Sequence, residues 1–106
     1  MSSALIDGLR AQCGGPRDGA LLRFSLGNAL LGAGDHAAAI EEFRRAVSFD
    51  PNYSAAWKLL GKACLAVHDE AGAAEAWRQG IAVAQQRGDK QAEKEMSVFL
   101  RRIEGA

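Results

Sequence analysis

Residues 23–50 read RFSLGNALLGAGDHAAAIEEFRRAVSFD and residues 57–84 read WKLLGKACLAVHDEAGAAEAWRQGIAVA, so one pattern occurs twice at a spacing of 34 residues. Nine of the 28 aligned positions are identical, against roughly two expected by chance. Such an internal duplication, with a period of about 20–50 residues, is typical of repeat proteins in which each unit packs on the next. The identical pairs are Leu26/Leu60, Gly27/Gly61, Ala29/Ala63, Leu31/Leu65, Asp35/Asp69, Ala37/Ala71, Ala39/Ala73, Glu41/Glu75 and Arg44/Arg78.

Each copy has the hydrophobic periodicity of two helices. In the first copy, apolar residues recur at spacings of three and four over residues 22–33 and again over 39–47, and Gly34-Asp35 separates the two runs. Asp50-Pro51 ends the second run, because proline disfavours helical geometry in the residue before it. The second copy follows the same plan, and no segment alternates like a strand. Its predicted inward-facing residues are Trp57, Leu60, Ala63, Cys64, Val67, Ala73, Ala74, Trp77, Gly80 and Ile81.

The residues at the repeated positions resemble the consensus of the tetratricopeptide repeat (TPR) family. The resemblance covers about two thirds of the chain and implies an all-α fold of tandem antiparallel helical hairpins, an α-solenoid. Arg23 departs from it by standing where the family has Trp, and Gln85 by replacing the closing Pro. The loss of that Pro implies that the last repeat helix runs on to Gln86 or Arg87. The matching residues are Leu26-Gly27, Ala39, Phe43, Ala46 and Pro51, and then Trp57, Leu60-Gly61, Ala73, Trp77 and Gly80.

The segments outside the two repeats are expected to cover the ends of the stack. A solenoid normally needs about three repeats, with atypical elements at its ends. We therefore predict a single domain of about six helices, with an N-terminal helix at 3–13, repeat 1 at 20–53, repeat 2 at 54–87 and a C-terminal capping helix at 88–104. The capping helix carries Ala92, Met96, Phe99, Leu100 and Ile103 at helical spacing, with Lys90, Lys94, Arg101 and Arg102 on its solvent side.

The charge balance excludes a strong overall attraction to polyanions. Thirteen basic and thirteen acidic residues cancel, so we expect neither nucleic acid nor a membrane surface as the partner. The first seven residues lack a basic leader followed by an apolar stretch, and no apolar run reaches the length that spans a bilayer. The sequence therefore predicts a cytoplasmic protein. Cys13 and Cys64 are expected to be free thiols, although the sequence alone leaves a disulfide between them open.

Catalytic, metal and cofactor sites are not predicted. His36 and His68 lie near the turns of their repeats, but they lack the regular spacing of a metal-ligand set. The glycines fall at turns and packing contacts rather than in a phosphate-binding loop. The carboxylates, such as Glu41 and Glu75, fall on polar helix faces where pairing with arginine is their usual role. We therefore expect no enzyme activity and no cofactor.

The resemblance implies a concave surface lined by the first helix of each repeat, and this surface is the candidate binding site. Its predicted character is an apolar groove with a basic edge. Alternatively, the terminal helices cover Phe24 and Leu31, and Lys58 and Lys62 only solvate their helix. If the two lysines are held close together, an anion from a partner, or from Asp89 or Glu93, is expected between them. The candidate residues are Leu21, Phe24, Asn28, Leu31, Lys58, Lys62 and Leu65.

The function expected from these residues is protein binding. The groove would take a peptide or helix that bears both apolar and acidic residues, as an adaptor does. Family members that bind acidic chaperone tails use a clamp of which this chain retains only Asn28, with Phe24 and Leu59 at two other clamp positions, which argues against that ligand. The alternative is assembly: the groove or a terminal helix pairs with a second copy, making a homodimeric scaffold, or adds the chain to a larger complex.

Overall fold

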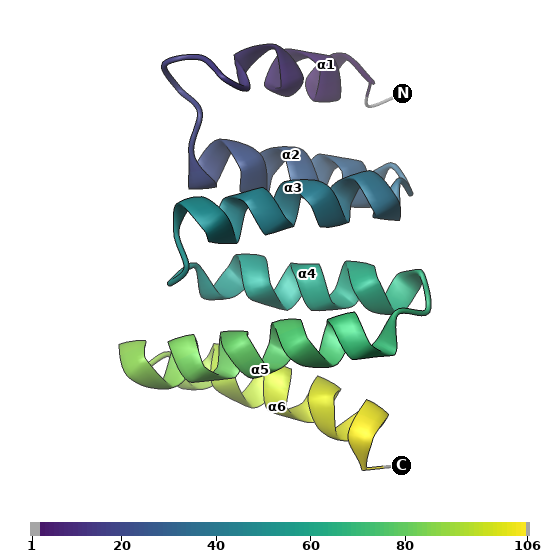
Figure 1. Ribbon diagram of the computed structural model, residues 1–106, viewed down its shortest axis with the longest axis vertical. Coiled ribbons are helices and arrows are strands. Elements are labelled where there is room, and N and C mark those ends of the chain that lie inside the picture. The colour runs from purple at the N-terminus through teal and green to yellow at the C-terminus, as the bar shows by residue number, and fades with distance from the viewer. Residues whose placement is uncertain (1–2, 106) are drawn as a thin grey trace.

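The computed structural model describes residues 3–105, with side chains from Ala4 onward, and this part of the chain is all helical. Figure 1 shows the helices stacked in chain order, from α1 at one end to α6 at the other. Successive helices run antiparallel, which confirms the predicted α-solenoid of helical hairpins. The helices are α1 (Ser3–Gln12), α2 (Ala20–Gly32), α3 (His36–Phe49), α4 (Ser54–Ala66), α5 (Glu70–Arg87) and α6 (Lys90–Glu104).

An aspartate side chain caps the start of three of these helices. Asp35, Asp69 and Asp89 precede α3, α5 and α6, and each accepts a hydrogen bond from the backbone N–H three residues later. These bonds satisfy N–H groups that have no partner inside the helix. Before two of the caps, Gly34 and Gly88 take positive φ angles of 84° and 72°, which glycine adopts without the steric cost of a Cβ. As predicted from the missing proline, α5 continues to Arg87.

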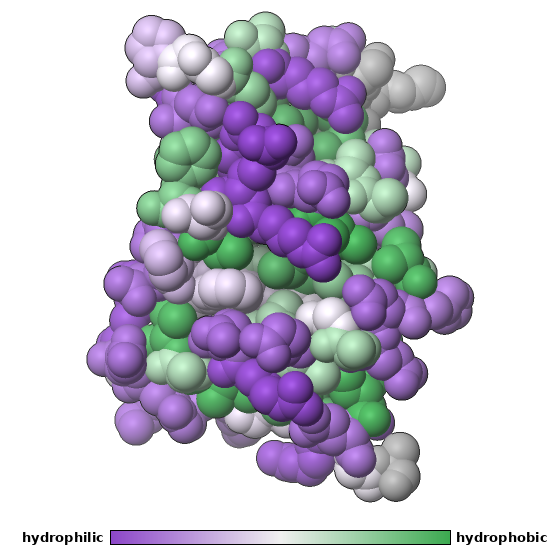
Figure 2. All heavy atoms as spheres, viewed as in Figure 1, coloured by the Kyte–Doolittle hydropathy of each residue, from purple (hydrophilic) through white to green (hydrophobic). Residues whose placement is uncertain are grey.

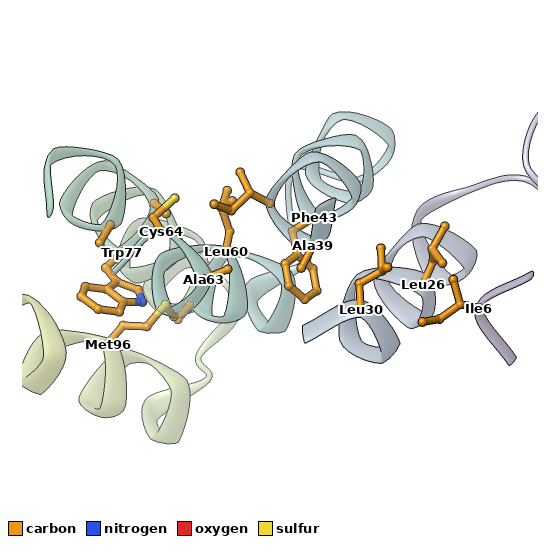
Figure 3. Close-up of a cluster of buried hydrophobic side chains, with 14 residues drawn as sticks. Ile6, Leu26, Leu30, Ala39, Phe43, Leu60, Ala63, Cys64, Trp77 and Met96 are labelled. Carbon is orange, nitrogen blue, oxygen red and sulfur yellow. The ribbon is translucent and has the colours of Figure 1, made fainter. Parts of the chain in front are cut away.

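Within each repeat, an aromatic ring from the second helix packs on a glycine of the first. A Cβ added to Gly27 would lie 2.7 Å from the ring of Phe43, and one added to Gly61 would collide with the indole of Trp77. The close approach of these helices therefore requires glycine, as the sequence indicated. Figure 3 shows the resulting core as a row of buried side chains that runs from Met96 past Trp77 and Phe43 to Ile6.

The two cysteines are free thiols in different surroundings. Cys64 is only 1% exposed, and burial raises the pKa of its thiol, whereas Cys13 is half-buried. Val67, which was predicted to face inward, is 42% exposed, and Ala33, at the matching end of the apolar run over residues 22–33, is exposed as well. Both are the C-caps of their helices, α2 and α4. The helical periodicity of the preceding turns does not extend through a cap.

Arg23 joins the loop before α2 to helix α3. Its guanidinium donates two hydrogen bonds to Asp18, at 2.8 and 2.9 Å, and one to Glu42 at 2.9 Å. The hydrogen bonds from Arg23 hold the pKa of Asp18 well below its usual value, and those to Asp18 and Glu42 raise the pKa of Arg23. Arg23 itself is 9% exposed. A buried, doubly paired arginine thus takes the place where the family has Trp.

Replacing Arg23 with Met is expected to lower the melting temperature. It should also make the melting temperature depend less on pH in the acidic range. Because the folded pKa of Asp18 is depressed, the stability from this group is fully present above the unfolded pKa and is lost as the pH falls through the folded pKa. Wild type should therefore lose stability progressively below about pH 5, and the variant should lose less of it. Thermal unfolding at a series of decreasing pH values measures the slope of melting temperature against pH for wild type and for the variant. Arg17→Met, at an exposed position, is the matched control, and equal slopes for wild type and Arg23→Met would show that the pairs are not coupled to stability.

Candidate functional site

The curvature of the stack follows from which helices touch. Among residues 3–105, α2 contacts α4 and α4 contacts α6, whereas α3 and α5 do not contact each other. The side on which alternate helices meet is the inside of the curve. The concave surface is therefore formed by α2 and α4, as the resemblance implied, and also by α6, which was predicted only as a cap.

Helix α2 carries an uncovered apolar side chain at its start. Leu21 is 70% exposed, the most exposed of the large apolar side chains in the described chain. About two and three turns further along, Asn28 is exposed, and Leu31 is partly buried against the core. Leu21 is thus open to apolar contact and Asn28 to hydrogen bonding.

Phe24 is partly buried, and the rings of two other aromatic residues pack on it. Its ring lies 5.9 Å from that of Phe43 and 4.8 Å from that of Tyr53, between centroids. Burial raises the pKa of Tyr53, in agreement with its apolar surroundings. Phe24 thus joins the packing of repeat 1 to the start of repeat 2 and offers only part of its ring to a ligand.

Both lysines of the predicted basic edge contact α6. The Lys58 ammonium lies 3.1 Å from the Glu95 carboxylate, and that of Lys62 lies 4.9 Å from the centroid of the Phe99 ring. The hydrogen bond from Lys58 lowers the pKa of Glu95. The anion beside the lysines is therefore neither of the two predicted residues, since Asp89 caps α6 and Glu93 accepts a hydrogen bond from Gln85.

Two residues of this site, Glu95 and Phe99, were missed by sequence reasoning. They are four residues apart on α6, as Lys58 and Lys62 are on α4, so two helical faces of matching spacing meet. This shared spacing was a signal present in the sequence. The remaining predicted residue, Leu65, is 37% exposed at the far end of α4.

A polar cleft of about 350 Å³ lies where the α3–α4 loop meets the turn before α6. The Arg87 guanidinium donates a hydrogen bond to the Asn52 carbonyl at 3.0 Å and so links the end of α5 to the α3–α4 loop. Asp50 and Asp89 also line the cleft, so Arg87 offsets only one of its two carboxylate charges. On the face seen in Figure 2, hydrophilic side chains predominate and interrupt the apolar ones. That face therefore offers no broad apolar area for a partner.

Over residues 3–105, the structure brings no three His, Cys, Asp or Glu side chains together in a way that could hold a metal ion. His36 lies at the start of α3, and its buried Nδ1 has no hydrogen-bond partner in the described structure. None of the described helices combines the length and the apolar character needed to cross a membrane.

Comparison with known proteins identifies the family. The model of the tetratricopeptide repeat matches residues 20–63. A TPR repeat-containing protein of Pseudomonas aeruginosa is 55% identical over 102 residues, which are 96% of this chain and 97% of that protein. The chain belongs to the TPR family. TPR domains mediate interactions between proteins, and the matched segment contains α2, α3 and most of α4, including part of the concave surface.

Solved structures extend the likeness over nearly all of this TPR chain. The solution structure of a protein from Bordetella parapertussis is 44% identical, has a TM-score of 0.78 and covers 96% of this chain and 86% of its own. The TPR domain of Sgt2 from Aspergillus fumigatus is 26% identical with a TM-score of 0.73, over 98% and 71% of the two chains. A heat-shock cognate co-chaperone of that fungus is 35% identical over 74 residues, only 22% of its length.

Proposed function

We propose that this TPR protein is a non-enzymatic adaptor that binds a peptide or helix along the concave surface of α2 and α4. The observation that carries the proposal is Leu21, an apolar side chain that the fold leaves 70% exposed on the helix that lines this surface. Grooves that bind an amphipathic peptide or helix take up its apolar side chains. Asn28 and the open side of Leu65 continue the same surface.

The contacts of α6 support an acidic and apolar character for the ligand. Glu95 and Phe99 lie against Lys58 and Lys62, so this edge already accommodates a helix that presents a carboxylate and an aromatic ring four residues apart. Lys62 is exposed and makes no ion pair within residues 4–105. It is therefore the lysine that remains available to an acidic side chain of a partner, whereas Lys58 is engaged by Glu95.

The test is selection of peptides from a random display library on the immobilised protein, followed by measurement of dissociation constants. Enriched peptides should combine apolar with acidic residues. Leu21→Asp is expected to weaken the binding of these peptides at least tenfold, through lost apolar contact and like-charge repulsion. Lys62→Glu should weaken peptide binding in a salt-dependent way, because the contact between Lys62 and an acidic side chain is solvent-exposed.

Phe49→Asp is the matched control, since Phe49 is 55% exposed but lies on α3, outside the concave surface. It should leave the affinities unchanged. Phe24→Ala is less suitable as a probe, because its ring packs on Phe43 and Tyr53 and its loss would also lower stability. If Leu21→Asp leaves peptide binding intact but converts a dimer to a monomer in light scattering, the groove is an assembly surface and the adaptor proposal is wrong.

A further inference from the structure

The 34-residue period continues backward into α1. Shifted by 34, Ile6 aligns with Ile40, Leu9 with the aromatic position of Phe43, and Arg10 with Arg44. Helix α1 therefore has the sequence pattern of the second helix of a repeat. Over residues 3–105, no helix takes the place of that repeat's first helix. Leu5 accordingly is 58% exposed, whereas Ala39, its equivalent in α3, is fully buried.

Helix α6 has the opposite character, since it follows α5 as α4 follows α3. The start of α6 lies 36 residues after that of α4, because α5 runs on to Arg87. At this spacing Met96 matches Leu60, and both are buried. Ser97 then falls on the position of Gly61, the glycine on which an aromatic ring packs in the complete repeat. Helix α6 is thus a first helix, and no second helix follows it in the described chain.

A cleft marks the place where that second helix would pack. It has a volume of about 380 Å³ and is lined by Ser97 and Leu100 together with Ile81, Arg101, Glu104 and Gly105. Ser97 and Leu100 occupy the positions that Gly61 and Cys64 occupy on α4, where the second helix of repeat 2 contributes Trp77. The cleft therefore lies at the position that the second helix occupies in the complete repeats.

We propose that α1 of a second copy fills this cleft, so that copies of the chain join end to end and α6 with the incoming α1 completes one repeat. The contact would continue, across two copies, the interface that α2 forms with α3 and α4 with α5. Side-chain sizes agree with this pairing. Where the complete repeats set a glycine against an aromatic ring, α6 has the larger Ser97 and α1 has the smaller Leu9.

Charges agree as well. Asp7 aligns with Glu41 and Glu75 in the period, and Glu75 lines a cleft together with Cys64 of α4. The residue of α6 that matches Cys64 is Leu100. Its neighbour Arg101 is exposed and makes no ion pair within residues 4–105. Asp7 of the incoming α1 would thus lie near an arginine. The surfaces are different on the two copies, so the contact is heterologous and can propagate into a chain. It leaves the groove on α2 and α4 open and does not depend on the adaptor proposal.

Sedimentation equilibrium on the full chain, from about 10 μM to about 1 mM, tests the proposal. For wild type, the mass is expected to rise with concentration above the 11.3 kDa of one copy. Leu5→Asp, on the exposed side of α1, and Ser97→Arg, in the cleft of α6, should each remain monomeric. An equimolar mixture of the two variants should form dimers and nothing larger, because each variant keeps the end that the other has lost.

Val67→Asp is the matched control, since Val67 is 42% exposed but lies at neither end of the stack. It should assemble as wild type does, and circular dichroism checks that all variants are folded. A wild type that is monomeric at every concentration overturns the proposal. So does a mixture of the two variants that stays monomeric, or a Leu5→Asp variant that assembles as wild type does.

Discussion

Replacing Leu60 with aspartate is expected to abolish cooperative thermal unfolding. Leu60 is 4% exposed and belongs to the core shared by both repeats. A buried carboxylate without a partner costs several kcal/mol, or forces local unfolding. A domain of this size has a total free energy of unfolding of about 5–15 kcal/mol, so one such group removes a large part of it.

Circular dichroism at 222 nm during heating measures this loss. Leu65→Asp is the matched control, because Leu65 lies on the same helix and is 37% exposed. Its melting should remain cooperative and should stay within a few degrees of wild type. A Leu60→Asp variant that melts as sharply as wild type would show that the core does not depend on this side of α4.

Deleting residues 88–106 is expected to produce a chain that aggregates or melts at a temperature lower by about 10 °C or more. The deletion removes Met96, which is fully buried against Gly80, and Phe99, whose ring lies 5.3 Å from that of Trp77. The apolar side of α5 would then face water, and an uncovered solenoid end promotes association.

Light scattering and thermal unfolding of the truncated chain provide the measurement. In the full-length chain, Met96→Asp should reproduce much of the loss, whereas Lys94→Asp on the exposed side of α6 should not. A truncated chain that stays monomeric with an unchanged melting temperature would mean that α6 contributes nothing to the fold.

The fold could be predicted because the determining signals are local and occur twice. Leu26 and Leu60 repeat the buried positions, Gly27 and Gly61 repeat the close helix contacts, and Gln85 in place of proline indicated the longer α5. Each of these features acts within one hairpin. Helix type and order therefore follow from periodicity and from the residues that end helices.

The site was harder to predict because its contacts depend on how helices are rotated relative to one another. The anion near Lys58 and Lys62 was expected from Asp89, Glu93 or a partner, but Lys58 pairs with Glu95, two residues beyond Glu93. The rotation of α6 is set by the length of α5 and the turn at Gly88, which periodicity locates only to within a residue or two. Arg23 stood out only as a departure from the family, since its partners Asp18 and Glu42 lie on other segments.

The order in which helices touch has a consequence for how the chain folds. Within residues 3–105, every helix contacts only its neighbours in sequence or the next helix but one. The mean sequence separation of contacting residues is therefore short, which favours rapid folding. Folding can begin in any hairpin and spread outward. Helix α1 contacts only α2, so it is stabilised by contacts on one side alone. Native-state hydrogen exchange should accordingly be fastest in α1 and slowest in α3 to α5, so protection follows position in the stack.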